Sequence, residues 1–275
     1  MPTPQKHFVF TMTPGRTGTG YLAALLESNA GPASQVAVHH EFLGFDDFGR
    51  ETPEMSHFTG FNCHGNTAAV RGFWEQKLGR IAATAGSHYV ETSHLLMKAG
   101  LAENIDLLTD AGTVHFIVLE RDVAATVRSY RRRGDFVNRI NARLWFLDPD
   151  YPRNIVKADR TMAGDWDGAC LWYICEVMTR AAYYRRILAD NDRVVFHDAA
   201  LETLADADTV NAPLDGLHMP RPTANLAIPC KVNESPPHFR LTSDEAARID
   251  AVIEKYPFDP DTLARDYVEN GGSLG

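Results

Sequence analysis

A glycine-rich segment at residues 13–22, with the sequence TPGRTGTGYL, has the residue types of an anion-binding loop. It follows a short apolar run at residues 7–12, typical of a buried strand, and leads into a helical pattern at residues 19–29. A loop between a strand and a helix presents backbone N–H groups and the positive end of the helix dipole to an anion. Arg16 adds a fixed positive charge, and the glycines allow the backbone to approach a ligand closely. We predict that a phosphate or sulfate group is bound by Gly15, Arg16, Thr17, Gly18, Thr19, Gly20 and Tyr21.

Two other kinds of phosphate loop can be compared with this segment. A Walker A loop ends in Gly-Lys-Ser/Thr, whereas this loop contains no lysine, which disfavours kinase or NTPase chemistry. The stretch from Gly18 to Ala23 does fit the dinucleotide pattern G-x-G-x-x-A, and Glu41 lies about where a ribose-binding acid is expected. The alternative is therefore a Rossmann-type NAD(P)-dependent oxidoreductase. Against it, five residues separate Met12 from Gly18, and Arg16 would have no role.

A second basic segment follows another predicted strand. Residues 113–119 are mostly apolar, and Arg121 comes shortly after them. Ser129 lies eight residues after Arg121, so two turns of a helix would bring its hydroxyl group to the same side. Residues 121–143 contain seven arginines and two aspartates, inside a chain whose formal net charge is −9. Because the arginine fork suits phosphate and sulfate oxygens, we predict a second anion site here.

Together the two segments resemble the family of sulfotransferases that use 3′-phosphoadenosine 5′-phosphosulfate (PAPS). The family's first loop reads Lys/Arg-Ser/Thr-Gly-Thr/Ser, and here it reads Arg-Thr-Gly-Thr at residues 16–19. Its second segment is a strand that ends in Arg-Asp or Arg-Asn, with a serine eight residues after the arginine, as in Arg121 and Ser129. The resemblance implies that the loop holds the 5′ end of PAPS and that Arg121 and Ser129 hold the 3′-phosphate.

The resemblance also implies an activity. It is the transfer of a sulfuryl group from PAPS, without a metal ion, to a hydroxyl acceptor that is a carbohydrate or a small-molecule alcohol or phenol. A later segment, Lys231-Val232-Asn233, resembles the part of the family that closes over the 3′-phosphate and adenine. His197 is a departure, because the family often ends the corresponding strand with Glu-Asp-Leu. A non-catalytic nucleotide-binding module is a further alternative.

The sequence offers three candidates for the base that removes the acceptor proton. Glu41 follows the second predicted strand, where several carbohydrate and tyrosyl-protein sulfotransferases place a catalytic glutamate. His94, in the stretch Glu-Thr-Ser-His-Leu, resembles the Lys-Thr-His-Leu of the cytosolic small-molecule enzymes, although the lysine is replaced. His40 adjoins Glu41, but strand alternation predicts that it points to the other face. We expect Glu41 first, then His94, then His40. Arg16, which stays protonated, is predicted to stabilise the leaving phosphate.

The elements that must position these residues alternate along the chain. We expect strands at residues 7–12, 35–40, 88–92, 113–119 and 193–197. We expect helices at residues 19–29, 67–85, 100–110, 122–133 and 165–189, and a last helix from Thr242, with Glu245 completing a capping box, to about Tyr256. Residues 41–66 and 135–165 are predicted to be irregular. This pattern predicts one three-layer α/β domain over residues 1–275, with a central parallel sheet and a strand–loop–helix that resembles a P-loop.

The composition limits the class of protein. The 275 residues are 44% hydrophobic and 23% charged, as in a folded globular protein. The net charge disfavours nucleic acid as a partner, although only six of the 27 basic residues are lysines. No apolar stretch approaches the length of a membrane span, no signal peptide is recognised, and the four cysteines form no CxxC pair. We expect a cytoplasmic protein with reduced thiols and no metal site, and the sequence leaves its oligomeric state open.

Overall fold

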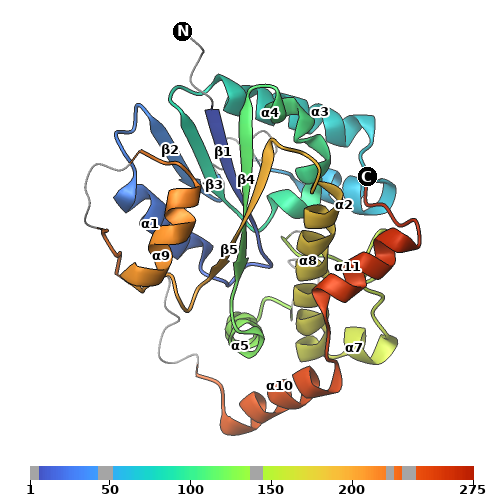
Figure 1. The fold of residues 1–275 in the computed structure, drawn as a ribbon. Helices are drawn as coiled ribbons and strands as arrows, with labels where there is room; N and C mark the ends of the chain where they lie inside the picture. Colours follow the sequence, from blue (N-terminus) through green and yellow to red (C-terminus); the bar gives the residue numbers. More distant parts are fainter. Residues whose placement is uncertain (1–5, 43–51, 137–144, 221–225, 231–239) are drawn as a thin grey trace.

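The computed structural model describes residues 6–42, 52–136, 145–220, 226–230 and 240–275. In these residues five parallel strands form one sheet in the order β2-β3-β1-β4-β5, with helices on both faces (Figure 1). The strands are β1 (Lys6–Met12), β2 (Val36–His40), β3 (His88–Thr92), β4 (Gly112–Glu120) and β5 (Val194–Ala200). The predicted α/β fold with a central parallel sheet is confirmed. The single domain over residues 1–275 stays a prediction.

The parallel arrangement brings the carboxyl ends of the strands to one edge of the sheet. Met12 of β1 pairs with Val118 of β4, and His40 of β2 pairs with Thr92 of β3. The chain segments that leave β1, β2, β3 and β4 at this edge carry the predicted loop, Glu41, His94 and Arg121. Open α/β sheets bind ligands outside this edge, so the topology places the candidate residues where a ligand site is expected.

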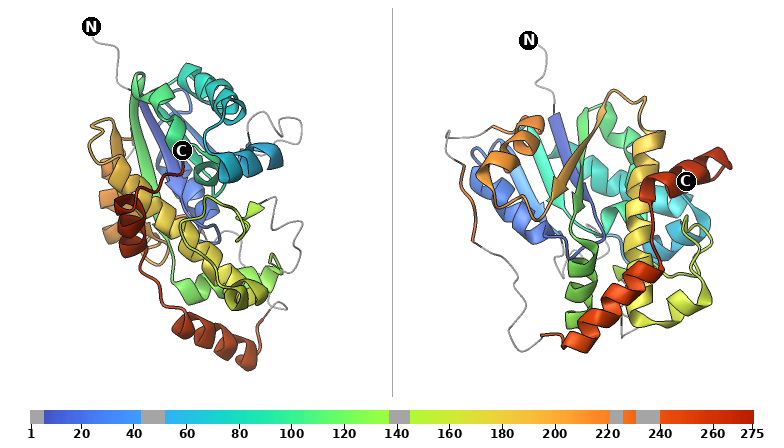
Figure 2. Two further views of the ribbon diagram at one scale, coloured as in Figure 1. Left: turned by 90° about the vertical axis from the view of Figure 1, so that its right-hand side faces the viewer. Right: turned by 60° about the horizontal axis from the view of Figure 1, so that its bottom comes forward.

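The helices divide between the two faces of the sheet. On one face lie α1 (Thr19–Asn29) and α9 (Ala207–Gly216). The other face is covered mainly by α2 (Met55–His64), α3 (Ala68–Ala83) and the long α8 (Trp166–Ile187). At and beyond the carboxyl edge lie α5 (Val123–Arg133) and α10 (Ser243–Lys255), as Figure 2 shows. The remaining elements are η2 (Leu96–Ala99), η3 (Ala102–Asn104), α4 (Asp106–Thr109), α7 (Arg160–Gly164) and α11 (Pro260–Glu269).

Two hydrophobic cores follow from the alternation of side chains along the strands. In β1, Phe8, Phe10 and Met12 point into the larger core with α2, α3 and α8. Val9, between them, points into the smaller core beneath α1 and α9. All four side chains are buried, as expected for a strand covered on both faces. Burial on both sides holds the end of β1, and therefore the start of the glycine loop, in one place.

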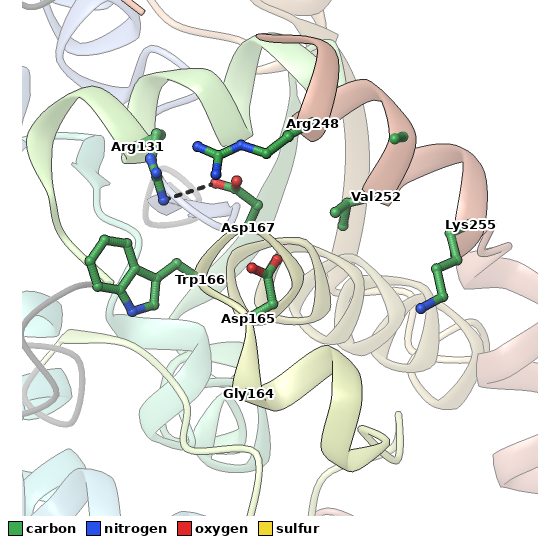
Figure 3. A pocket seen from close by; sticks show the side chains of 9 residues that line it. Arg131, Gly164, Asp165, Trp166, Asp167, Arg248, Val252 and Lys255 are labelled. Atoms are coloured by element: carbon green, nitrogen blue, oxygen red, sulfur yellow. Dashed lines mark ion pairs between the residues drawn. The ribbon is translucent and has the colours of Figure 1, made fainter. Parts of the chain in front are cut away.

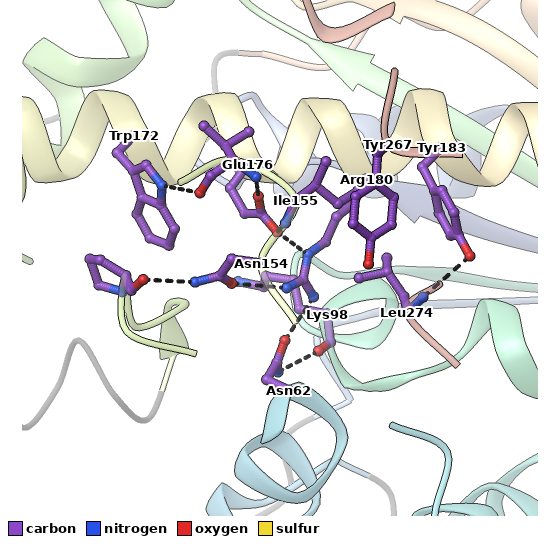
Figure 4. A network of polar contacts seen from close by, with 12 residues as sticks. Asn62, Lys98, Asn154, Ile155, Trp172, Glu176, Arg180, Tyr183, Tyr267 and Leu274 are labelled. Carbon is purple, nitrogen blue, oxygen red and sulfur yellow. Dashed lines mark hydrogen bonds and ion pairs between the residues drawn. The ribbon is translucent and has the colours of Figure 1, made fainter. Parts of the chain in front are cut away.

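A buried polar network joins α8 to α2 and to the segment that follows β3 (Figure 4). Arg180 of α8 donates to Glu176 (Nε–Oε1 2.6 Å), to Asn62 of α2 (2.7 Å) and to Asn154 (3.1 Å). Asn62 in turn donates to the backbone oxygen of Lys98 at 3.0 Å. Arg180, Glu176 and Asn62 are fully buried. Since each charge is paired and hydrogen-bonded, the network ties α2, α8 and η2 together.

Some expected elements differ from the structure. Residues 41–66 were expected to be irregular, but they contain α2, whose Phe58 and Phe61 lie in the core. Burial of these two aromatics outweighs the weak helix propensity of Thr59 and Gly60. The helix expected at residues 100–110 is instead divided into the short η3 and α4, which follow Gly100 with its positive φ of 92°.

Three further helices were not expected. These are α9, the short α7 inside residues 135–165, and α11, which follows the helix that was predicted to be the last. The capping box itself is confirmed, because the Thr242 hydroxyl accepts from the Glu245 N–H while the Glu245 carboxylate accepts from the Thr242 N–H. Among the helices of the described residues, none combines the length and the apolarity needed to cross a bilayer.

Candidate active site at the carboxyl edge of the sheet

The glycine loop leaves β1 in an unusual backbone conformation. Gly15, Arg16 and Gly18 have positive φ angles of 91°, 59° and 92°, a region that favours glycine. A Cβ atom at Gly15 would lie 2.8 Å from the Tyr130 hydroxyl oxygen, and one at Gly18 would overlap the Leu201 side chain. The two glycines are therefore required both by the turn and by the close packing around it.

The helix that follows the loop begins without a side-chain cap. Gly18 occupies the N-cap position of α1, and no described side chain accepts a hydrogen bond there. By contrast, α2, α3, α5, α8, α10 and α11 are each capped by a side chain, namely Glu54, Thr67, Asp122, Asp165, Thr242 and Asp259. The first N–H groups of a helix need an acceptor. At α1 this acceptor can be an anion bound in the loop.

Not every predicted loop residue faces outward. The hydroxyl groups of Thr13 and Thr17 hydrogen-bond each other inside the loop. The Tyr21 side chain packs into the smaller core, and its hydroxyl is buried without a partner among the described residues. Thr19 and Gly20 form the first turn of α1, with Thr19 buried. The backbone and Arg16, more than the threonine and tyrosine side chains, are thus available to a ligand.

Arg16 joins the loop to the second predicted anion segment. Its Nε donates to the Ser129 hydroxyl at 3.1 Å, and Arg121 Nη1 donates to the Arg16 backbone oxygen at 2.9 Å. Neither arginine forms an ion pair with a carboxylate in the described residues. Burial lowers the pKa of Arg16, and the positive charges of Arg133 and Arg121 lower it further. Asp135 acts on Arg16 and Glu202 on Arg121 only through their negative charges, without an ion pair, so both guanidinium groups keep N–H donors for an anion.

The other arginines of the basic segment behave differently. Arg128 pairs with Asp250 of α10, Arg131 with Asp167 of α8, and Arg133 with Asp135. Arg132 donates to the backbone oxygen of Arg128. Arg139 and Arg143 lie outside the described residues. Arg128 and Arg131 therefore help to dock α10 and α8, which leaves Arg121 as the arginine of this segment that contacts the glycine loop.

Two of the three candidate bases lie together beside the loop. The His94 Nε2 is 3.5 Å from the Glu41 Oε1. The His94 ring also lies against the loop, since a Cβ at Gly15 would be 3.1 Å from His94 Cγ. Glu41 has a φ of 41°, a strained value for a non-glycine residue, and its N–H donates to the Thr92 oxygen at 2.9 Å. His40 Nδ1 instead contacts the backbone and hydroxyl oxygens of Thr92, so it is engaged within the sheet edge.

Sequence reasoning missed three buried side chains behind His94. Lys98 is fully buried, and its Nζ lies 3.0 Å from His94 Nδ1, 2.5 Å from the Tyr173 hydroxyl and 2.7 Å from the Trp145 backbone oxygen. The hydroxyl groups of Tyr130 and Tyr173 both donate to the Pro14 oxygen of the loop. The only local signal was the spacing of four residues between His94 and Lys98, which places two side chains on one side of a helical turn.

Burial dominates the electrostatics of this group. Burial lowers the pKa of Lys98, while the negative charge of Glu41 raises it. Burial also lowers the pKa of His94, and the positive charge of Lys98 lowers it further. The His94 ring is therefore held neutral at physiological pH. Burial raises the pKa of Tyr130 and of Tyr173, so both phenols keep their protons.

A cleft of about 510 Å³ lies between α5, α10 and the start of α8, on the side of α5 that faces away from Ser129 (Figure 3). Its wall includes Trp166, which is 47% exposed, and Arg131, which lies over the indole ring. Ser129 and Arg131 are about 200° apart around the helix, so the cleft faces away from the contact with Arg16. None of the predicted site residues lines it. The described residues contain no cluster of three or more side chains that could hold a metal ion.

The site thus combines the glycine loop, two arginines that form no ion pair within the described residues, and a carboxylate beside a neutral imidazole. Such a site can neutralise a phosphate and accept a proton from a group held next to it. Lys231, Val232 and Asn233 lie outside the described residues, so their predicted contact with the nucleotide stays a prediction. No protein-family model matches this chain, and the comparison with curated proteins gives no match either.

Proposed function

We propose that the chain is a PAPS-dependent sulfotransferase that acts on a hydroxyl group of a carbohydrate or of a small-molecule alcohol or phenol. The observation that carries this proposal is the meeting of the two anion segments. Arg16 contacts Ser129 across 113 positions of the sequence, and Arg121 contacts the Arg16 backbone. Two phosphate sites that adjoin each other suit a nucleotide with a phosphate at each end of one ribose.

Each group has a role in the proposed reaction. The acceptor oxygen forms a bond to sulfur while the bond from sulfur to the 5′-phosphate oxygen breaks, which leaves 3′,5′-ADP. The acceptor proton passes to a base, for which Glu41 and His94 are available beside the loop. Arg16 and the N–H groups of the first turn of α1 stabilise the charge on the departing phosphate. Arg121 and Ser129 hold the 3′-phosphate.

The strand order argues against the dinucleotide alternative. In the Rossmann fold, with the order 3-2-1-4-5-6, the second strand lies beside the first. Here β3 separates β2 from β1, so Glu41 follows a strand two places from the loop. The positive φ of Gly15 and Arg16 also adds a turn before Gly18 that the short dinucleotide loop lacks. An NAD(P) site is therefore the weaker proposal.

Calorimetry with nucleotides tests the binding part of this proposal. We expect 3′,5′-ADP to bind, 5′-AMP to bind at least tenfold more weakly because it lacks the 3′-phosphate, and NADH not to bind. Micromolar affinity for NADH together with no binding of 3′,5′-ADP would overturn the assignment and favour an oxidoreductase.

Turnover tests the catalytic part. Labelled PAPS is incubated with the native chain and a panel of sugars, alcohols and phenols, and transfer of the label to an acceptor is measured. We expect transfer to at least one hydroxyl compound. Tight binding of 3′,5′-ADP without transfer to any acceptor would instead favour a non-catalytic nucleotide-binding module.

A further inference from the structure

The contacts of Lys98 define the direction of its hydrogen bonds. The Trp145 backbone oxygen can only accept, and the Tyr173 hydroxyl uses its proton to donate to the Pro14 oxygen at 2.6 Å. Both must therefore accept from Lys98 Nζ. The third contact is His94 Nδ1 at 3.0 Å. In its ammonium form, which the negative charge of Glu41 favours and burial opposes, lysine has three N–H donors and no acceptor, so the three contacts match its three protons.

With Lys98 as an ammonium, this arrangement determines where the proton of the His94 ring lies. A neutral imidazole carries one proton, and the nitrogen without it accepts. If Nδ1 accepts from Lys98, the proton is on Nε2, which faces Glu41 Oε1 at 3.5 Å. A carboxylate can only accept, so this tautomer suits both neighbours. The opposite tautomer would place an N–H against the ammonium and a lone pair against the carboxylate.

We propose that Lys98 is a positioning residue that holds His94 as the Nε2–H tautomer, so that His94 orients Glu41, and Glu41 alone is the base. The assignment of the tautomer rests on the ammonium form of Lys98, whereas the role of Glu41 rests on the proposed sulfotransferase function. The acceptor proton moves to a Glu41 oxygen as the new oxygen–sulfur bond forms, and Glu41 later releases it to water. His94 keeps its Nε2 proton throughout and is not a catalytic residue in this scheme.

Nuclear magnetic resonance of the full chain with isotope-labelled histidine tests the tautomer directly. Correlation spectra distinguish a ring nitrogen that carries a proton from one that does not, and the His94 signals are those lost in His94→Gln. We expect the proton on Nε2 and a bare Nδ1 in the native chain. A proton on Nδ1 would overturn the proposal, and this readout needs neither PAPS nor any activity.

The Lys98→Met variant tests whether the lysine causes this preference. We expect its His94 signals to lose the strict Nε2–H pattern. The Lys77→Met variant removes another fully buried lysine, one that pairs with Glu91, and we expect it to leave the His94 signals in place. An unchanged His94 tautomer in folded Lys98→Met would overturn the role of Lys98. If that variant does not fold, the native spectrum still decides the tautomer.

Kinetics with PAPS separates Glu41 from His94. Glutamine at position 94 can accept from Lys98 with its oxygen and donate to Glu41 with its nitrogen, as the imidazole does. We expect His94→Gln to keep kcat within about tenfold, and Glu41→Gln to lower it by about 10²- to 10⁴-fold with KM for PAPS unchanged. An equal loss in both variants would overturn Glu41 as sole base. Absence of transfer by the native chain counts against the proposed function, while the spectrum still decides the tautomer.

Discussion

At the scale of single residues, the candidate site is marked by two arginines, Arg16 and Arg121, that form no ion pair within the described residues. Arg16 and Arg121 contact each other's segment but pair with no carboxylate in the described residues, while Arg128, on the same helix as Ser129, pairs with Asp250. Because Arg121 forms no ion pair with the residues that the structure describes and Arg128 does, we expect their replacement to affect nucleotide affinity differently.

Replacement of Arg121 by alanine is expected to weaken binding of 3′,5′-ADP at least tenfold. A charge-assisted hydrogen bond contributes about 1.5–3 kcal/mol, and the variant loses it. Arg128→Ala is the matched control, and we expect it to leave the affinity unchanged because Arg128 contacts Asp250. Titration calorimetry on both variants is the measurement. Equal losses would remove Arg121 from the site.

Replacement of Gly18 by alanine is expected to lower the stability of the protein and to abolish binding of 3′,5′-ADP. The backbone there has a φ of 92°, and the new methyl group would overlap Leu201. Gly72, in the middle of α3 with open space around it, serves as the contrast. Gly72→Ala is expected to stabilise the helix by about 0.5–1 kcal/mol. Urea denaturation of both variants tests this, and a Gly18→Ala protein as stable as the native one would contradict it.

At the scale of elements, one face of the sheet carries a row of histidines. His7, His88, His115 and His197 come from β1, β3, β4 and β5. His7 and His115 are joined at 2.9 Å (Nδ1–Nε2), His115 and His197 are joined in the same way, and the rings of His7 and His88 stack. Burial lowers the pKa of His88 to about 4 and, with help from His197, that of His115 to about 3.

These pKa values predict that the fold is less stable in mild acid. Both folded values lie below the ordinary value of 6.5, so the unfolded chain binds more protons as the pH falls below 6.5. The stabilisation that comes from keeping these histidines neutral is fully present above pH 6.5. It is lost progressively as the pH falls toward the folded pKa values of about 4 and about 3. Between pH 6.5 and 5 the loss is about 2 kcal/mol for each buried histidine. Urea denaturation at pH 7 and pH 5 measures it.

A variant assigns this effect to the histidine row. Glutamine at position 115 does not titrate, so His115→Gln is expected to reduce the loss of stability between pH 7 and pH 5. His64→Gln, at an exposed position at the end of α2, is the control and should keep the native pH dependence. The same pH dependence in His115→Gln and the native chain would show that His115 does not contribute.

At the scale of the whole molecule, the buried Arg180 network links the segments that carry the site. It joins α8 to α2 and, through Asn62, to the backbone of Lys98. Replacement of Arg180 by methionine leaves the buried Glu176 carboxylate without its partner, and we expect a loss of about 3–5 kcal/mol of unfolding free energy.

The double variant is the control for this prediction. Glu176→Gln together with Arg180→Met removes both charges and is expected to be more stable than Arg180→Met alone, because no unpaired charge remains buried. Urea denaturation of the single and double variants is the measurement. A double variant that loses as much as the sum of the two single changes would contradict the pairing.

Elements of the fold could be predicted from the sequence where neighbouring residues determine them, and could not where contacts with distant segments do. The five strands and the helix at residues 19–29 follow from apolar runs and turn residues next to them, and each was expected close to its observed position. The α2 helix could not be expected, because its stability comes from the burial of Phe58 and Phe61 against other segments. In the site, Arg16, Arg121 and Ser129 could be selected by spacing. Lys98 could not, since its partners Trp145 and Tyr173 come from distant parts of the chain.

The sequence by itself determined which segments are strands, and it singled out the glycine loop and the candidate bases Glu41 and His94, because these depend on residue type and short-range periodicity. Only the tertiary structure decided that β3 lies between β1 and β2, that Glu41 and His94 meet beside Gly15, and that arginines of α5 pair with acids. These features depend on strand order and on contacts between residues far apart in the chain. Packing of the whole molecule selects such contacts, and they cannot be read from the pattern of neighbouring residues in the sequence.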